Sequence, residues 1–268
     1  MSGRAYGAEQ KNILILALVC NSDWHSLPAL VAEYIKGLSR HVRITLVTHI
    51  HNRDNLSGFM PPEVSITYID TEVIARPFFK LSSLLAGDPN KGMTLRVALS
   101  YPNTLYFEYS AWKLYKKALA AGEFDLVHRI SPMSPTMPSP MASWLAKKTR
   151  VPFVIGPVLG GLDWPDQFKG EMRREGEWVN YIRGLHRYLP YYSGTYKYAS
   201  AILAGYAHTV GDIPPRDRSR VIEFSEGGIH LSDFPERVFK DKSRSQILFV
   251  GRLVPFKQPE LLVRCFVE

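Results

Sequence analysis

Several signatures that would reveal a function directly are missing from this 268-residue sequence. It holds no Gly-x-Gly-x-x-Gly fingerprint, no Walker A loop, no His-Glu-x-x-His and no Cys-x-x-Cys. The missing fingerprint counts against a dinucleotide-dependent oxidoreductase. The two cysteines, Cys20 and Cys265, cannot form a disulfide framework, which favours a reducing compartment. No run approaches the roughly 18 apolar residues of a membrane helix.

The composition is that of a globular protein with a surplus of positive charge. Hydrophobic residues make up 46% and charged residues 22%, and the length suits one large domain or two small ones. The formal net charge of +8 favours anionic partners, or it marks a basic solvated surface without a partner. The apolar run 13–20 is short for a signal peptide and lacks a cleavage site, so we interpret it as a buried first strand.

Strand and helix patterns alternate along the chain. Apolar and β-branched runs predict strands at 13–20, 42–48, 64–69, 124–130, 151–155, 199–204 and 220–225. Helical spacing predicts helices over 27–38, 105–121 and 171–189, another that ends near 148, and one or two in the less regular stretch 76–121. This alternation predicts an α/β fold with a Rossmann-like, doubly wound and mostly parallel sheet.

The end of the sequence carries the most specific pattern. Residues 246–257 read Gln-Ile-Leu-Phe-Val-Gly-Arg-Leu-Val-Pro-Phe-Lys, and Pro259 is typical of a first helical turn. The apolar run 247–250 predicts a buried parallel strand. Arg252 and Lys257 would then lie beyond the carboxyl end of that strand, beside a helix N-terminus. Sheets of α/β proteins bind phosphates at such places.

This pattern, together with the order of the elements before it, resembles the family 4 retaining glycosyltransferases, which have the GT-B fold of two Rossmann-like domains. In that family a Val-Gly-Arg-Leu-x-x-x-Lys stretch contacts the diphosphate of a nucleotide-sugar donor, which implies this role for Arg252 and Lys257. The resemblance covers most of the chain. It implies an acceptor-side domain over 1–234, a linker over 235–245, and over 246–268 the first strand and partial helix of an incomplete donor-binding domain.

The resemblance also implies a reaction. A sugar would pass from a nucleotide-diphosphate sugar to the hydroxyl of a glycan or lipid-linked acceptor, with retention of anomeric configuration. No metal or other cofactor is expected, because the Asp-x-Asp of metal-dependent glycosyltransferases is missing. Relatives hold the donor sugar with glutamates further downstream, and about 20 residues cannot build a second core, so this chain alone is expected to be inactive. The alternative is a non-catalytic Rossmann-like module that binds an acceptor glycan, a lipid or a partner.

Two segments in the middle of the chain are candidate parts of the site. His128 stands near the carboxyl end of an expected strand, where a histidine of the resembled family lines the sugar pocket, which implies a catalytic role. The alternative is a core histidine bonded to backbone, and Arg129 is expected only to flank the strand. Gly160 and Gly161 would let a ligand approach the backbone closely, and Asp163 either orients an acceptor hydroxyl or stabilises a turn.

Two weaker signals lie at the ends of the first two expected strands. The first loop lacks the Gly-Gly pair that is common in relatives, although Ser22 and His25 remain candidates for facing the cleft. His49 and His51 lie on one side of a strand end, as a metal pair would, with Asp54 nearby. No convincing third ligand is evident, so the sequence favours a polar strand end over a metal site.

Residues 171–198 are rich in basic and aromatic side chains. This favours docking on a peripheral membrane surface, or it marks a domain helix with a basic outer face and a tyrosine-rich core edge. The expected location is cytoplasmic, either free or at the inner face of the membrane. No nucleic-acid partner is expected.

Overall fold

The computed structural model describes residues 10–87, 91–160, 162–177, 184–225, 227–228, 231–233, 247–251, 253 and 257–267. Its centre is a seven-stranded sheet in the order β3-β2-β1-β4-β5-β6-β7, and every neighbouring pair is parallel. The strands are β1 (Asn12–Ala17), β2 (Arg43–His49), β3 (Ser65–Ile69), β4 (Leu126–Ser131), β5 (Phe153–Val158), β6 (Ala201–Ala204) and β7 (Val221–Glu223). The predicted α/β fold with a Rossmann-like sheet is confirmed.

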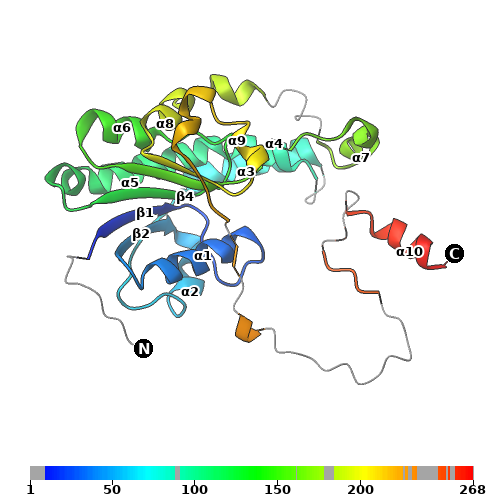
Figure 1. Ribbon diagram of the computed structural model, residues 1–268, viewed down its shortest axis with the longest axis horizontal. Coiled ribbons are helices and arrows are strands. Elements are labelled where there is room, and N and C mark those ends of the chain that lie inside the picture. Colours follow the sequence, from blue (N-terminus) through cyan, green and yellow to red (C-terminus); the bar gives the residue numbers. More distant parts are fainter. Residues whose placement is uncertain are drawn as a thin grey trace.

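Helices cover both faces of this sheet (Figure 1). On one face lie α1 (Leu27–Leu38) and α2 (Arg53–Leu56). The other face carries α3 (Glu72–Ala86), α4 (Met93–Leu99), α5 (Tyr101–Ala121), α6 (Pro140–Lys148) and α8 (Tyr192–Tyr198). The remaining short helices are η1 (Ile50–Asn52), η2 (Asp166–Phe168), α7 (Lys169–Arg174), α9 (Ala207–Val210), η4 (Pro215–Arg220) and η5 (Leu231–Asp233).

The central strand β1 shows how one sequence run supplies both cores. Successive side chains of a strand point to opposite faces of the sheet. Ile13 and Ile15 join the core under α1, while Leu14 and Leu16 join the core under α5. Because both faces are covered, the strand is apolar at consecutive positions, as expected for a buried parallel strand.

The predicted helix over 171–189 is interrupted near its start, and residues 178–183 lie outside the described residues. Helix α7 ends at Arg174, and Gly176 adopts a left-handed conformation with φ of 68°. The amides of Gly176 and Glu177 donate to the carbonyls of Arg173 and Met172, both at 3.0 Å. These are the two hydrogen bonds of a Schellman motif, which closes a helix at a glycine.

The predicted strand at 247–250 is also wrong. These residues belong to no strand, and Ile247, Leu248 and Val250 are exposed by 61%, 83% and 84%. A strand needs a neighbour to pair its backbone groups, and the described strands end with β7 at Glu223. Helix α10 (Pro259–Val267) does begin at the predicted proline, and Figure 1 shows it apart from the sheet. The expected linker, 235–245, lies outside the described residues.

Within the part of the chain that the structure describes, no helix combines the length and the apolar character that crossing a membrane requires.

Candidate functional site

The direction of the strand order reverses between β1 and β4. From β1 the chain continues to β2 and β3 on one side, whereas β4 is followed by β5, β6 and β7 on the other. Open parallel sheets bind their ligands at this switch point, outside the carboxyl ends of the strands. The candidate site is therefore bounded by the loops that follow β1, β4 and β5.

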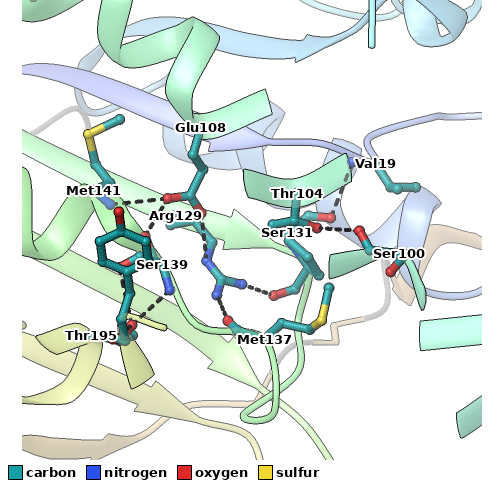
Figure 2. Close-up of polar contacts among 12 residues, drawn as sticks. Val19, Ser100, Thr104, Glu108, Arg129, Ser131, Met137, Ser139, Met141 and Thr195 are labelled. Carbon is teal, nitrogen blue, oxygen red and sulfur yellow. Dashed lines mark hydrogen bonds and ion pairs between the residues drawn. The ribbon is translucent and has the colours of Figure 1, made fainter. Parts of the chain in front are cut away.

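The loop after β4 is held from beneath by a buried arginine (Figure 2). Arg129 was expected only to flank its strand, but its side chain is 1% exposed and lies under the loop. Its guanidinium donates to the carbonyls of Pro132 and Met137. A planar group with five donors can satisfy several loop carbonyls at once and still face a carboxylate.

The partner of Arg129 is Glu108 of α5, which is also 1% exposed. The guanidinium Nε lies 3.6 Å from Glu108 Oε1. The other carboxylate oxygen accepts from Ser139 Oγ at 2.5 Å and from the Met141 amide at 3.3 Å. Burial raises the pKa of Glu108, and the nearby guanidinium opposes that rise. One ion pair therefore fixes both ends of the loop between β4 and α6.

His128 precedes this arginine in β4 and is 3% exposed. Its ring meets Tyr34 edge to face at 5.9 Å between centroids. Its Nε2 lies 2.8 Å from the carbonyl oxygen of Gly156, and because a carbonyl only accepts, Nε2 carries the proton. Burial lowers the pKa of His128 to about 4, against the opposing effect of the bond to Gly156. The placement is that of a neutral core histidine joining β4 to β5, and its implied catalytic role stays a prediction.

The loop after β5 is tied to the loop after β4. The amide of Leu159 donates to the carbonyl of Met133 at 2.9 Å, and Gly160, with φ of 109°, accepts a bond from Thr209 Oγ1 at 2.6 Å. Gly160 is exposed at the carboxyl edge, which agrees with a backbone that a ligand could approach. Asp163 is exposed in the same loop, and Gly161 lies outside the described residues.

The loop after β1 is fastened by amide side chains. Asn21 is buried, and its Oδ1 accepts from the amides of Asp23 and Trp24 at 3.0 and 3.2 Å. Its Nδ2 donates to Asn55 Oδ1 at 3.0 Å, and Ser22 Oγ lies 2.9 Å from the Asn55 carbonyl oxygen. Ser22 thus belongs to the fastening of the loop, while His25 is exposed at its rim. The sequence analysis missed Asn21 and Asn55, although an asparagine just after a strand is a turn signal.

Of the two predicted diphosphate contacts, the structure describes only Lys257. Arg252 lies outside the described residues. Lys257 is exposed and lies just before α10, which Figure 1 shows apart from the strands. The structure therefore leaves the role of this pair as a prediction.

One groove lies at the opposite edge of the sheet. It has a volume of about 630 Å³ and is bounded by the end of α5 and the residues that lead into β4, and by the end of α6 and the residues that lead into β5. Lys147, Lys148 and Arg150 give its rim a positive charge. Since parallel sheets place ligands at the other edge, this groove is distinct from the candidate site.

In comparisons with known proteins, no family model, no curated protein and no solved structure matches the chain. The fold class, a Rossmann-like α/β sheet flanked by helices, therefore rests on the strand order and the parallel pairing alone.

Proposed function

We propose that the chain is the acceptor-side part of a retaining glycosyltransferase, which moves a sugar from a nucleotide-diphosphate sugar to the hydroxyl of a glycan or lipid-linked acceptor. The supporting observation is the all-parallel sheet with its switch point between β1 and β4, whose loop is held by a buried ion pair. The sequence from Gly251 to Lys257, which resembles a donor-diphosphate motif, adds the second support.

Each group has a definite part in this proposal. Arg252 and Lys257 bind the donor diphosphate, and exposed backbone at Gly160 borders the acceptor. The donor's own phosphate takes the proton of the acceptor hydroxyl while the cations stabilise the leaving diphosphate. His128 is neutral near pH 7, and its Nε2–H group donates a hydrogen bond to the carbonyl oxygen of Gly156. In this proposal it therefore shapes the pocket and does not act as an acid or a base. This chemistry requires no metal ion.

Donor binding and turnover test the proposal. A panel of nucleotide-diphosphate sugars is screened by calorimetry, and sugar transfer is followed by NMR, for the 268-residue chain and for the longest polypeptide that its gene encodes. Lys257→Ala is expected to weaken binding by about 1–3 kcal/mol, the range for hydrogen bonds to charged groups. Lys113→Ala, at an exposed lysine of α5, is the matched control.

If no donor binds to either polypeptide, the glycosyltransferase proposal fails. Sugar transfer by the 268-residue chain alone would support the proposal and would contradict only the expectation, implied by the resemblance, that this chain is inactive by itself.

A non-catalytic binding module is the second candidate. Two side chains that were expected to face the cleft are instead hydrogen-bonded within the protein, which favours this candidate. His128 is bonded to the carbonyl of Gly156, and Ser22 to the carbonyl of Asn55. This candidate predicts binding of acceptor glycans with no affinity for any nucleotide sugar. The same calorimetric panel, extended to glycans, separates the two functions.

We further propose a cytoplasmic location with docking on the inner face of an anionic membrane. The supporting side chains lie just before α7 and in the segment that leads to α8: Phe168, Leu185 and Tyr188 are exposed by 36%, 56% and 86%. Arg173 and Arg174 add positive charge at the end of α7. Tyr188→Ser is expected to reduce co-sedimentation with anionic vesicles at low salt, whereas binding that is unchanged by this substitution argues against the surface.

A further inference from the structure

Two imidazoles and a carboxylate face one another where β2 and β3 end. His49 is the last residue of β2, His51 lies in η1, and Glu72 is the first residue of α3. Glu72 Oε1 lies 3.2 Å from His51 Nε2 and 3.8 Å from His49 Nε2. One possible ligand atom from each of these three residues lies within 4.8 Å of the other two.

A third candidate ligand was not evident from the sequence, and the structure supplies one in Glu72. In the parallel pairing of β2 with β3, His49 lies opposite Ile69. Glu72 comes shortly after Ile69, at the start of α3, and its position there brings the Glu72 side chain to the two histidines. The ligand therefore comes from the next strand end rather than from Asp54, the nearby acid in the sequence.

The spacing suits a small divalent ion. Bonds of about 2.0–2.1 Å in a tetrahedral arrangement place neighbouring ligand atoms about 3.4 Å apart. The two distances to Glu72, 3.2 and 3.8 Å, lie on either side of this value. The His51 side chain is 56% exposed, so it can turn to close the remaining distance.

Two neighbouring side chains set the orientation and the charge around Glu72. Arg76 Nε donates to Glu72 Oε2 at 2.6 Å, which holds the carboxylate with its other oxygen toward the histidines. Asp70 adds a second negative charge, and its side chain accepts from the Glu72 amide at 2.8 Å.

Two backbone N–H groups approach the buried ring of His49, which is more hydrogen-bond donors than a neutral imidazole can accept. The amide of His51 approaches its Nδ1 at 3.2 Å, and the amide of Thr71 approaches its Nε2 at 3.4 Å. A neutral imidazole has a single lone pair, so it accepts only one of these bonds. Ligation of an ion through Nε2 uses that lone pair and leaves the proton on Nδ1, so the contacts with the Thr71 amide and the His51 amide must both open.

We propose that His49, His51 and Glu72 bind one zinc-type divalent metal ion, with the fourth coordination position open to solvent. Imidazole nitrogen and carboxylate oxygen are ligands that suit zinc and its neighbours in the first transition row. Three protein ligands with one open position leave room for a water molecule or an anionic ligand. The site is independent of the glycosyltransferase proposal, because it lies at the ends of β2 and β3 rather than at the switch point.

Metal titration of the full 268-residue chain tests this site. Protein without a histidine tag is stripped with EDTA, desalted and titrated with Co²⁺, whose visible absorption reports tetrahedral ligation, and then with Zn²⁺. One ion is expected per chain, with displacement of Co²⁺ by Zn²⁺ and a higher thermal midpoint in its presence.

Two variants locate the ion. His51→Ala and Glu72→Gln are each expected to weaken binding at least about tenfold, since even outer partners of metal ligands contribute roughly 10–100-fold. His41→Ala, at an exposed histidine away from the cluster, should bind like the wild type. Circular dichroism confirms that each variant is folded. Failure of the wild type to take up an ion, or wild-type affinity in both ligand variants, would overturn the proposal.

Discussion

Replacing Arg129 with methionine tests whether the buried ion pair holds the loop at the switch point. The substitution keeps much of the aliphatic volume of the side chain but removes the guanidinium. Glu108 would then remain buried without a cation, and the carbonyls of Pro132 and Met137 would lose their donor. The change is thus confined to the contacts shown in Figure 2.

The expected cost is about 3–5 kcal/mol, the range found when one partner of a buried ion pair is removed. The matched control is Arg76→Met. Arg76 also pairs with a glutamate, Glu72, but its side chain is 73% exposed. An exposed pair one helical turn apart contributes only about 0.3–0.5 kcal/mol. Burial, rather than ion pairing itself, is therefore the cause of the difference that we expect.

Urea unfolding at pH 7, followed by tryptophan fluorescence, measures both variants. Trp112 of α5 and Trp144 of α6 lie close together, with ring centroids 5.7 Å apart, so they report on the region around the ion pair. A cost for Arg129→Met below about 1 kcal/mol, comparable with an exposed pair, would refute the reasoning.

The pH dependence of the same variant provides a second check. Burial raises the pKa of Glu108 above its ordinary value of 4.5, and Arg129 is the largest influence that opposes this rise. Without Arg129, the folded state binds a proton at pH values where the unfolded state has released it. Stability then falls as pH rises above 4.5 and is regained on acidification. Arg129→Met should show this gain from pH 7 toward pH 5, and the double variant with Glu108→Gln should lack it.

Two further predictions concern Gly156 of β5 and His128 of β4, which are joined by a hydrogen bond. Gly156 has φ of 121°, and a Cβ atom there would lie 2.3 Å from the Leu203 carbonyl oxygen, so Gly156→Ala should destabilise the fold by several kcal/mol in urea unfolding. Gly37→Ala, in α1 with open space around it, should instead stabilise by about 0.5–1 kcal/mol. His128 has a folded pKa of about 4 against 6.5 when unfolded, so the unfolded state alone gains a proton as pH falls through this range. The wild type should lose about 3 kcal/mol of stability from this group between pH 6.5 and 4, and equal slopes in the wild type and His128→Gln would contradict the assignment.

The strands and two of the long helices could be predicted because their signal is local. In β1, consecutive apolar residues reflect burial on both faces, and the glycine at 122 ends α5 in the left-handed conformation. The stop of α7 at Gly176 was also visible as a glycine in the sequence, but the amphipathic pattern beyond it outweighed that signal.

The features that could not be predicted depend on contacts between residues that are far apart in the sequence. A charged residue within a strand suggests an edge position, and only the approach of Glu108 from α5 lets Arg129 be buried. Glu72 meets His49 because of the strand register, which no sequence pattern reports. The apolar run 247–250 has strand character, but strand formation depends on a neighbouring strand, which the pattern itself cannot supply.

Ligand binding at the carboxyl edge of the sheet, between β1 and β4, is central to the proposed function. Hydrogen exchange followed by mass spectrometry, with and without nucleotide-diphosphate sugars and candidate acceptor glycans, measures this directly. We predict slower exchange in the loops after β1, β4 and β5. Slower exchange confined to residues 119–125 and 147–152, which border the groove at the other edge, would contradict it, as would unchanged exchange with every ligand.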